Sequence, residues 1–117
     1  MSIAAKIREA VAFTGFPCAQ VSYNGEEKTY FSFNMDTRPE MFCDDEPDAG
    51  VCEVQLHLFA PFTLDTTSLR KKIKRAIFDA GFTYPEMVDA SEHIRSGDGT
   101  EQHIVFEFEI ETGADEE

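Results

Sequence analysis

Residues 51–59 read VCEVQLHLF, and this stretch decides the fold. Apolar and polar side chains alternate along it, which predicts a strand with one buried and one polar face. The apolar face consists of Cys52, Val54, Leu56 and Leu58. The same alternation returns in QHIVFEFEIE, residues 102–111, the clearest strand of the sequence. We therefore expect a sheet that buries one face and exposes the other.

Two other segments have the spacing of amphipathic helices. In residues 2–14 the apolar stripe is Ile3, Ile7, Ala10, Val11 and Thr14. In residues 65–80 it is Leu69, Ile73, Ala76, Ile77 and Ala80. Ser2 is placed to cap the first helix, and Gly15 and Gly81 are placed to end the two helices. Both helices need an apolar partner, which the buried face of the sheet provides.

The remaining strands are shorter. Asn24-Gly25 separates AQVSY from EEKTYFSFNM, and this dipeptide predicts a tight hairpin. Residues 82–94 form a weak strand broken by Pro85, and residues 95–100 form a turn before the last strand. The predicted order is α-β-β-β-α-β-β. The predicted fold is α+β, with an antiparallel sheet of about four to five strands and both helices packed on one face. A single domain spans residues 1–112 with a long loop at 37–50, and residues 113–117 form an acidic tail that we expect to be disordered.

The net charge of the chain limits the kinds of molecule that it can bind. The chain has 117 residues, and 23 acids against 10 bases give a net charge of −13. This charge opposes binding to nucleic acid and to anionic membrane surfaces. The first residues, MSIAAKIREAV, carry Lys6, Arg8 and Glu9 within their apolar pattern, where a signal peptide has an uncharged apolar region. We therefore expect a cytoplasmic protein with reduced cysteines.

The sequence contains only incomplete metal-binding and catalytic motifs. Residues 44–48 resemble the start of a calcium loop, but that loop would need Gly at Ala49 and Glu at Gln55. Cys43 and Cys52 lack the spacing of a zinc site, and we expect His57 and His103 to form a cross-strand surface pair rather than a ligand set. We predict no catalytic, metal-binding or cofactor-binding residues and no cofactor.

Two charged features have both a plain and a functional interpretation. The first is the basic run of the second helix, Arg70, Lys71, Lys72, Lys74 and Arg75. It is either a solvated helix face or a docking patch for an acidic neighbour such as a second copy. The second is the outward stripe Glu107, Glu109 and Glu111 on the last strand. Such a stripe is normally a solvated sheet face.

Several short motifs follow one another in an order that resembles a known family. They are Thr29, Tyr30, Phe33 and Asn34; Arg38 and Pro39; Asp44, Asp45 and Glu46; Val54, Leu56, Leu58 and Phe59; and Ala80, Gly81 and Phe82. Together they cover nearly the whole chain and resemble small phage and prophage tail-completion proteins of the tail-terminator type, which are minor capsid proteins. The acid-rich C-terminus and the pair Cys43 and Cys52 depart from the family pattern.

The resemblance implies a non-enzymatic virion protein. Such subunits form rings, often hexamers, that complete the tail at the head-tail junction and meet the tail tube and the head connector. It implies assembly in the host bacterial cytoplasm, location in the virion tail, no membrane, and DNA that passes nearby without specific binding. On this interpretation the interaction residues are Arg38, Asp44, Asp45, Glu46, Asp48 and the basic run, and Glu107, Glu109 and Glu111 face a lumen.

Two alternatives remain open. The first is a small cytoplasmic α+β module that binds a ligand or regulates a partner, for which a deep apolar pocket would be the distinguishing feature. The second is an enzyme that uses Cys18 or Cys43, for which a lowered thiol pKa would be the distinguishing feature.

Overall fold

The computed structural model describes residues 2–39, 50–91 and 101–112. Its elements are α1 (Ile3–Val11) with a 3₁₀ turn (Ala12–Thr14), β1 (Cys18–Gln20), β2 (Tyr30–Pro39), β3 (Gly50–Pro61), α2 (Thr67–Asp79), β4 (Glu86–Asp89) and β5 (Glu101–Thr112). This succession confirms the predicted order of helices and strands. The weak strand predicted around Pro85 begins directly after that proline.

β3 is the central strand of a five-stranded sheet with the order β1-β2-β3-β5-β4. It pairs antiparallel with β2 on one side and with β5 on the other. Leu56 of β3 lies between Phe33 of β2 and Phe106 of β5 in register. These three side chains are completely buried. The alternation that predicted the strand therefore also sets the register, because a slip by one residue would move every apolar side chain to the open face.

The sheet is mixed rather than purely antiparallel, because β1 pairs parallel with β2. The hairpin predicted at Asn24-Gly25 is accordingly wrong. The Phe31 amide donates to the Pro17 carbonyl, and the Val21 amide donates to the Phe33 carbonyl, both at 2.8 Å. Val21 then turns the chain out of the sheet with a φ of 78°. Tyr23 stacks on Tyr30 with ring centroids 4.7 Å apart, so aromatic packing in this segment outweighs the local turn signal.

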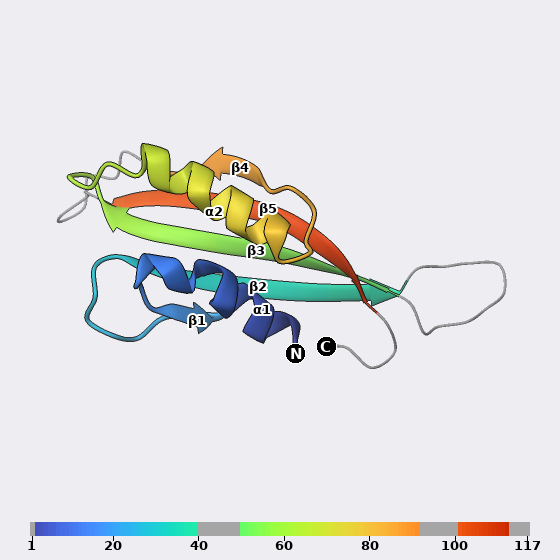
Figure 1. Cartoon of the computed structure of the whole chain (residues 1–117). Coiled ribbons are helices and arrows are strands. Elements are labelled where there is room, and N and C mark those ends of the chain that lie inside the picture. The colour runs from blue at the N-terminus through green and yellow to red at the C-terminus, as the bar shows by residue number, and fades with distance from the viewer. Residues whose placement is uncertain (1, 40–49, 92–100, 113–117) are drawn as a thin grey trace, which may run out of the picture.

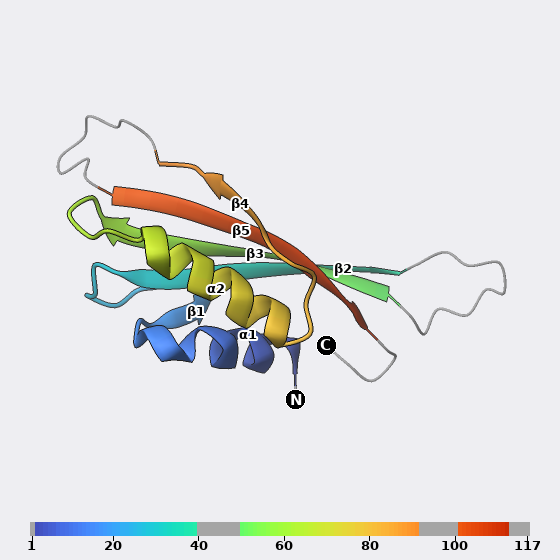
Figure 2. The ribbon, with the colours of Figure 1, turned by 45° about the horizontal axis from the view of Figure 1, so that its top comes forward.

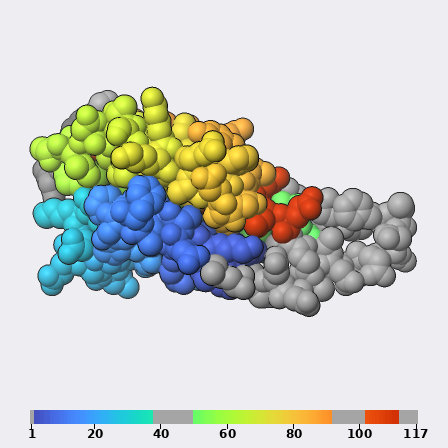
Figure 3. Space-filling model, in the orientation of Figure 1, coloured from blue at the N-terminus to red at the C-terminus, as the bar shows by residue number. Residues whose placement is uncertain are grey.

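Both helices pack on the same face of the sheet, as predicted (Figures 1 and 2). They contact each other and lie side by side over that face (Figure 3). The helices contribute completely buried isoleucines to the core: Ile3, Ile7, Ile73 and Ile77. The sheet contributes Phe31, Phe33, Cys52, Val54, Leu56, Leu58, Ile104, Phe106 and Phe108. One apolar core therefore joins two helices to three strands, and in the described ranges no helix lies on the opposite face of the sheet.

The predicted helix ends are confirmed. The Ser2 hydroxyl accepts a hydrogen bond from the Ala5 amide at 3.1 Å. Gly15 and Gly81 have φ angles of 77° and 106°, which glycine adopts without the steric cost that a side chain adds. The strands extend into the predicted loop at 37–50, because β2 continues to Pro39 and β3 begins at Gly50. Residues 40–49, and the predicted tail at 113–117, lie outside the described residues.

A buried polar cluster joins the start of α2 to β5. The Gln102 side chain is 7% exposed, and its amide nitrogen donates to the carbonyls of Pro61 and Leu64 at 2.8 and 2.6 Å. Its amide oxygen accepts from the Thr66 hydroxyl at 2.9 Å and from the Arg70 guanidinium at 3.2 Å. One side chain thus satisfies four groups, and it fixes the position from which α2 begins.

We predict that Gln102→Ala lowers the free energy of unfolding by about 2–4 kcal/mol, because it leaves several buried polar groups without partners. Urea unfolding followed by circular dichroism measures this loss. Gln55→Ala is the matched control, since Gln55 is exposed on β3, and we expect a change of about 0.5 kcal/mol or less. Equal losses in the two variants would contradict the structural role of Gln102.

Candidate functional site

The open face of the sheet divides into two chemically different ends. Toward one end, Tyr30 of β2, Phe59 of β3 and His103 of β5 lie opposite one another in register. Toward the other end, Asp36, Glu53 and Glu109 occupy the corresponding positions on the same three strands. Period-two alternation in the strands places all of these side chains on the face that the helices leave uncovered.

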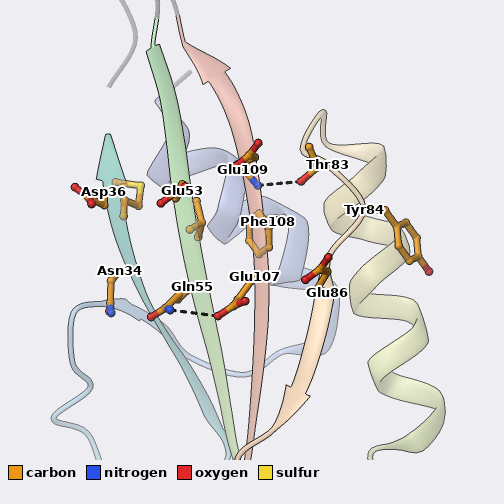
Figure 4. A pocket seen from close by; sticks show the side chains of 12 residues that line it. Asn34, Asp36, Glu53, Gln55, Thr83, Tyr84, Glu86, Glu107, Phe108 and Glu109 are labelled. Atoms are coloured by element: carbon orange, nitrogen blue, oxygen red, sulfur yellow. Dashed lines mark hydrogen bonds between the residues drawn. The ribbon is translucent and has the colours of Figure 1, made fainter. Parts of the chain in front are cut away.

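The acidic end is hollowed into a groove of about 710 Å³. Five carboxylates from four strands line it: Asp36, Glu53, Glu86, Glu107 and Glu109. Asn34, Gln55, Thr83 and Tyr84 contribute further polar side chains, and no Lys or Arg belongs to this lining within the described residues. Figure 4 shows these side chains across neighbouring strands, with Tyr84 at the rim beside α2. We call this surface the acidic groove.

Like charges face one another directly in the acidic groove. Glu86 is the register partner of Glu107, and Glu53 lies between Asp36 and Glu109. The amide of Gln55 donates to the Glu107 carboxylate at 3.3 Å (Figure 4). The Thr83 hydroxyl accepts from the Glu109 amide at 3.0 Å and ties the segment before β4 to β5. Opposed carboxylates on neighbouring strands destabilise a sheet, so the groove favours a cationic partner.

The structure separates the members of the predicted basic run. Arg70 is half-buried, and its guanidinium donates to Thr66 and Gln102 inside the chain. Lys71, Lys72 and Arg75 are exposed on α2. Arg75 forms an ion pair with Asp79 at 3.3 Å, with both side chains more than half exposed. Arg70 therefore has a structural role that sequence reasoning missed, and the other cations of the run remain at the surface.

Sequence reasoning also missed an aromatic component beside these cations. Phe78 and Tyr84 are 46% and 52% exposed and meet edge to face at 5.7 Å. Arg75 lies over the Phe78 ring and Lys74 over the Tyr84 ring, each at 5.9 Å from the centroid. One stripe of the helix surface contains Lys71, Lys74, Arg75 and Phe78. Their spacing in the sequence was the signal that could have predicted this combined cationic and aromatic surface. We call these four residues the α2 stripe.

The other end of the open face is a ladder of stacked rings. Tyr30 stacks on Phe59 at 5.0 Å, and Phe59 stacks on His103 at 4.4 Å. The predicted pairing of His57 with His103 is confirmed, because His57 Nδ1 lies 2.8 Å from His103 Nε2. Burial, followed by the charge of His103, lowers the pKa of His57. The pair therefore favours a state in which His57 is neutral and shares a hydrogen bond.

The cysteines bear on the predicted enzyme alternative. Burial raises the pKa of the Cys18 thiol to about 11, and Arg8 only partly offsets this. Burial also raises the pKa of Cys52, which lies in the core. Protonated thiols are poor nucleophiles, so neither residue has the chemistry of a catalytic cysteine. Cys43 lies outside the described residues.

The predicted stripe Glu107, Glu109 and Glu111 lies on the open face of β5, and its first two members line the acidic groove. Arg38 lies in β2 beside Val51 of β3. Asp44, Asp45, Glu46 and Asp48 lie outside the described residues. Within the described ranges, His, Cys, Asp and Glu form no cluster of three or more suited to a metal ion. None of the helices in those ranges has the length and apolar character needed to cross a bilayer.

Comparisons with known proteins give a fold relationship. No protein-family model matches the chain, and a search of curated proteins finds no match. Among solved structures, the chain is similar to one from the virion of a native gene transfer agent particle, with a TM-score of 0.59. The alignment covers 96% of this chain and 95% of the other at 12% sequence identity. The two chains therefore share a fold over essentially their full lengths.

The acidic groove predicts a gain of stability on removal of charge. Glu86→Gln removes one of two opposed carboxylates, and we expect the free energy of unfolding to rise by about 0.2–1 kcal/mol at low salt. Urea unfolding at low and at high salt measures the effect, which screening should remove. Glu26→Gln, on the exposed segment before β2, is the control and should change nothing. A gain that persists at high salt would contradict an electrostatic origin.

The histidine pair predicts sensitivity to acid. The pKa of His57 is lower in the folded chain than its ordinary value of 6.5, so the unfolded chain binds more protons near that pH. The contribution of His57 to stability is therefore present above pH 6.5 and is lost as the pH falls below it. Thermal unfolding between pH 7.5 and 5.5 should show a steeper loss of stability for the wild type than for His57→Gln. Equal slopes would contradict this interpretation.

Proposed function

We propose that this chain is a structural protein of a phage-like virion, and that it completes the tail at the head-tail junction by self-association into a ring. The observation that carries the proposal is the fold shared over its full length with a chain of a gene transfer agent virion. The resemblance of its motifs to tail-completion proteins supports the finer assignment. The motifs in the described residues lie at the start of β2 and along it, on β3 and directly after α2, whereas Asp44, Asp45 and Glu46 lie outside the described residues.

The surface of the described residues supports an assembly role. It presents an uncovered sheet face with a broad acidic groove, and a helix with exposed cations and an exposed phenylalanine. Both surfaces suit contacts with other proteins, in which aromatic and arginine side chains contribute strongly. The partners on this proposal are further copies of the chain, the tail tube and the head connector. Assembly takes place in the host cytoplasm, and DNA passes without specific binding.

A small ligand-binding or regulatory module is the second candidate, and the acidic groove is the observation that favours it. The groove has the volume of a small-molecule site. However, five carboxylates and the side-chain amides of Asn34 and Gln55 line it, so its ligand would have to be a cation. Calorimetric titration with a polyamine that showed one tight site per chain would favour this candidate over the virion protein.

The proposed function predicts a defined assembly defect. Deletion of the gene from the phage or prophage that encodes it should leave filled heads and separate tails, because no subunit completes the tail end. Electron microscopy of lysates measures the fraction of joined particles, and expression of the intact gene in trans is the control. Joined particles with tails of normal length in the deletion strain would refute a role in tail completion.

A further inference from the structure

We propose that the acidic groove of one copy of this chain receives the α2 stripe of a second copy. This inference rests on the proposed function and deepens it, because it names the two surfaces that meet in the assembly. The acidic residues that the family resemblance places among the interaction residues, Asp44, Asp45, Glu46 and Asp48, lie outside the described residues. The acidic groove is a second acceptor, and the contacts of the described residues define it.

The two surfaces belong to different sides of the molecule. α2 covers the apolar face of the sheet (Figure 2), and Lys71, Arg75 and Phe78 of its stripe are exposed to solvent. The groove lies on the open face of the sheet (Figure 4). Tyr84, at the turn between α2 and β4, marks the boundary between the two surfaces. A surface that binds a different surface on the next copy makes a head-to-tail contact, which closes into a ring when the rotation between copies permits.

The charges of the two surfaces are complementary. The groove presents five carboxylates, and the α2 stripe presents the cations of Lys71, Lys74 and Arg75. Arg75 also forms an exposed ion pair with Asp79 on the same helix, which it would share with the groove. The chain has only 10 bases against 23 acids, so three cations on one helical stripe are an uneven distribution. A neighbour's stripe would offset the repulsion between Glu86 and Glu107, which face each other across β4 and β5. A second copy is therefore the occupant that the charges favour.

The α2 stripe is shorter than the acidic groove and therefore fits within it. The α2 stripe runs from Lys71 to Phe78, which is about 10 Å of helix at 1.5 Å per residue. The carboxylates of the groove extend from Asp36 on β2 to Glu86 on β4, about 14 Å across three strand spacings. The cations of the stripe span four residue steps, about 6 Å of helix, so a helix that crosses the strands would place them over two neighbouring strands of the groove. The amides of Asn34 and Gln55 offer further hydrogen-bond partners along that path.

Phe78 adds an apolar contact to this electrostatic interface. Its ring is 46% exposed, and Arg75 lies over it at 5.9 Å. Burial of an exposed aromatic ring beside an arginine is typical of the residues that dominate binding energy. The interface assigns Glu107 and Glu109 to a contact between copies. This differs from the lumen position that the family resemblance implies for them.

Charge reversal on each surface tests the interface. The stripe variant is Lys71→Glu/Arg75→Glu, and the groove variant is Asp36→Lys/Glu86→Lys/Glu107→Lys, which leaves three bases against two acids in the groove. All five side chains are exposed, so we expect both variants to fold, and circular dichroism checks this. Lys6→Glu/Lys28→Glu is the control, because it changes the net charge by the same amount as the stripe variant at two other positions. Light scattering across concentration and salt measures association, alone and with tail tubes.

We expect the wild type and the control to associate, and each reversed variant alone to associate at least about tenfold more weakly. An equimolar mixture of the two variants should recover association, because each acidic stripe then meets a basic groove and each basic stripe meets an acidic groove. Variants that associate like the wild type, or that stay apart when mixed, would overturn the interface and leave the proposed function standing. A wild type that never associates, even with tail tubes, would overturn both.

Discussion

The pairing of β3 on both of its edges is the constraint on which the rest of the structure depends. Because β3 lies between β2 and β5, its alternation of side chains fixes the register of three strands at once. Leu56 and its neighbours then form one apolar surface, and both amphipathic helices pack on that surface. The alternating polar residues Glu53, Gln55 and His57 of β3 then lie on the opposite face, beside their partners on β2 and β5.

The same constraint creates the chemistry of the open face. Carboxylates that are distant in sequence, such as Asp36 and Glu109, are brought to either side of Glu53. Directly opposed carboxylates reduce the stability of a sheet, and a cationic partner would offset that repulsion. The exposed cations and the aromatic ring of α2 form the complementary surface on the helix layer.

The sequence predicts the parts of the fold that rest on periodicity. The strands at 51–59 and 102–111 and both helices were predictable, because their apolar patterns agree with the packing that the structure shows. The parallel pairing of β1 with β2 was not predictable from the sequence. Asn24-Gly25 gives a strong local signal for a hairpin, whereas the stacking of Tyr23 on Tyr30 depends on the tertiary fold.

The candidate site was predictable only in part. Exposed cations on α2 and outward acids on β5 follow from spacing alone. The inward role of Arg70 depends on Gln102, 32 positions along the chain, and no local pattern indicates that contact. The acidic groove needs the order of the strands, since Glu86 joins Glu107 only because β4 pairs with β5. Sequence spacing thus identifies the charged residues, and topology decides which of them meet.

Cross-linking between isotopically distinct copies tests the central claim most directly. A mixture of ¹⁴N- and ¹⁵N-labelled protein, treated with a zero-length carbodiimide and analysed by mass spectrometry, separates contacts between copies from contacts within one copy. The account predicts mixed-isotope links from Lys71 and Lys74 of α2 to Glu86 and Glu107 of the sheet face. Mixed-isotope links that join other surfaces and leave this pair of surfaces unlinked would contradict it.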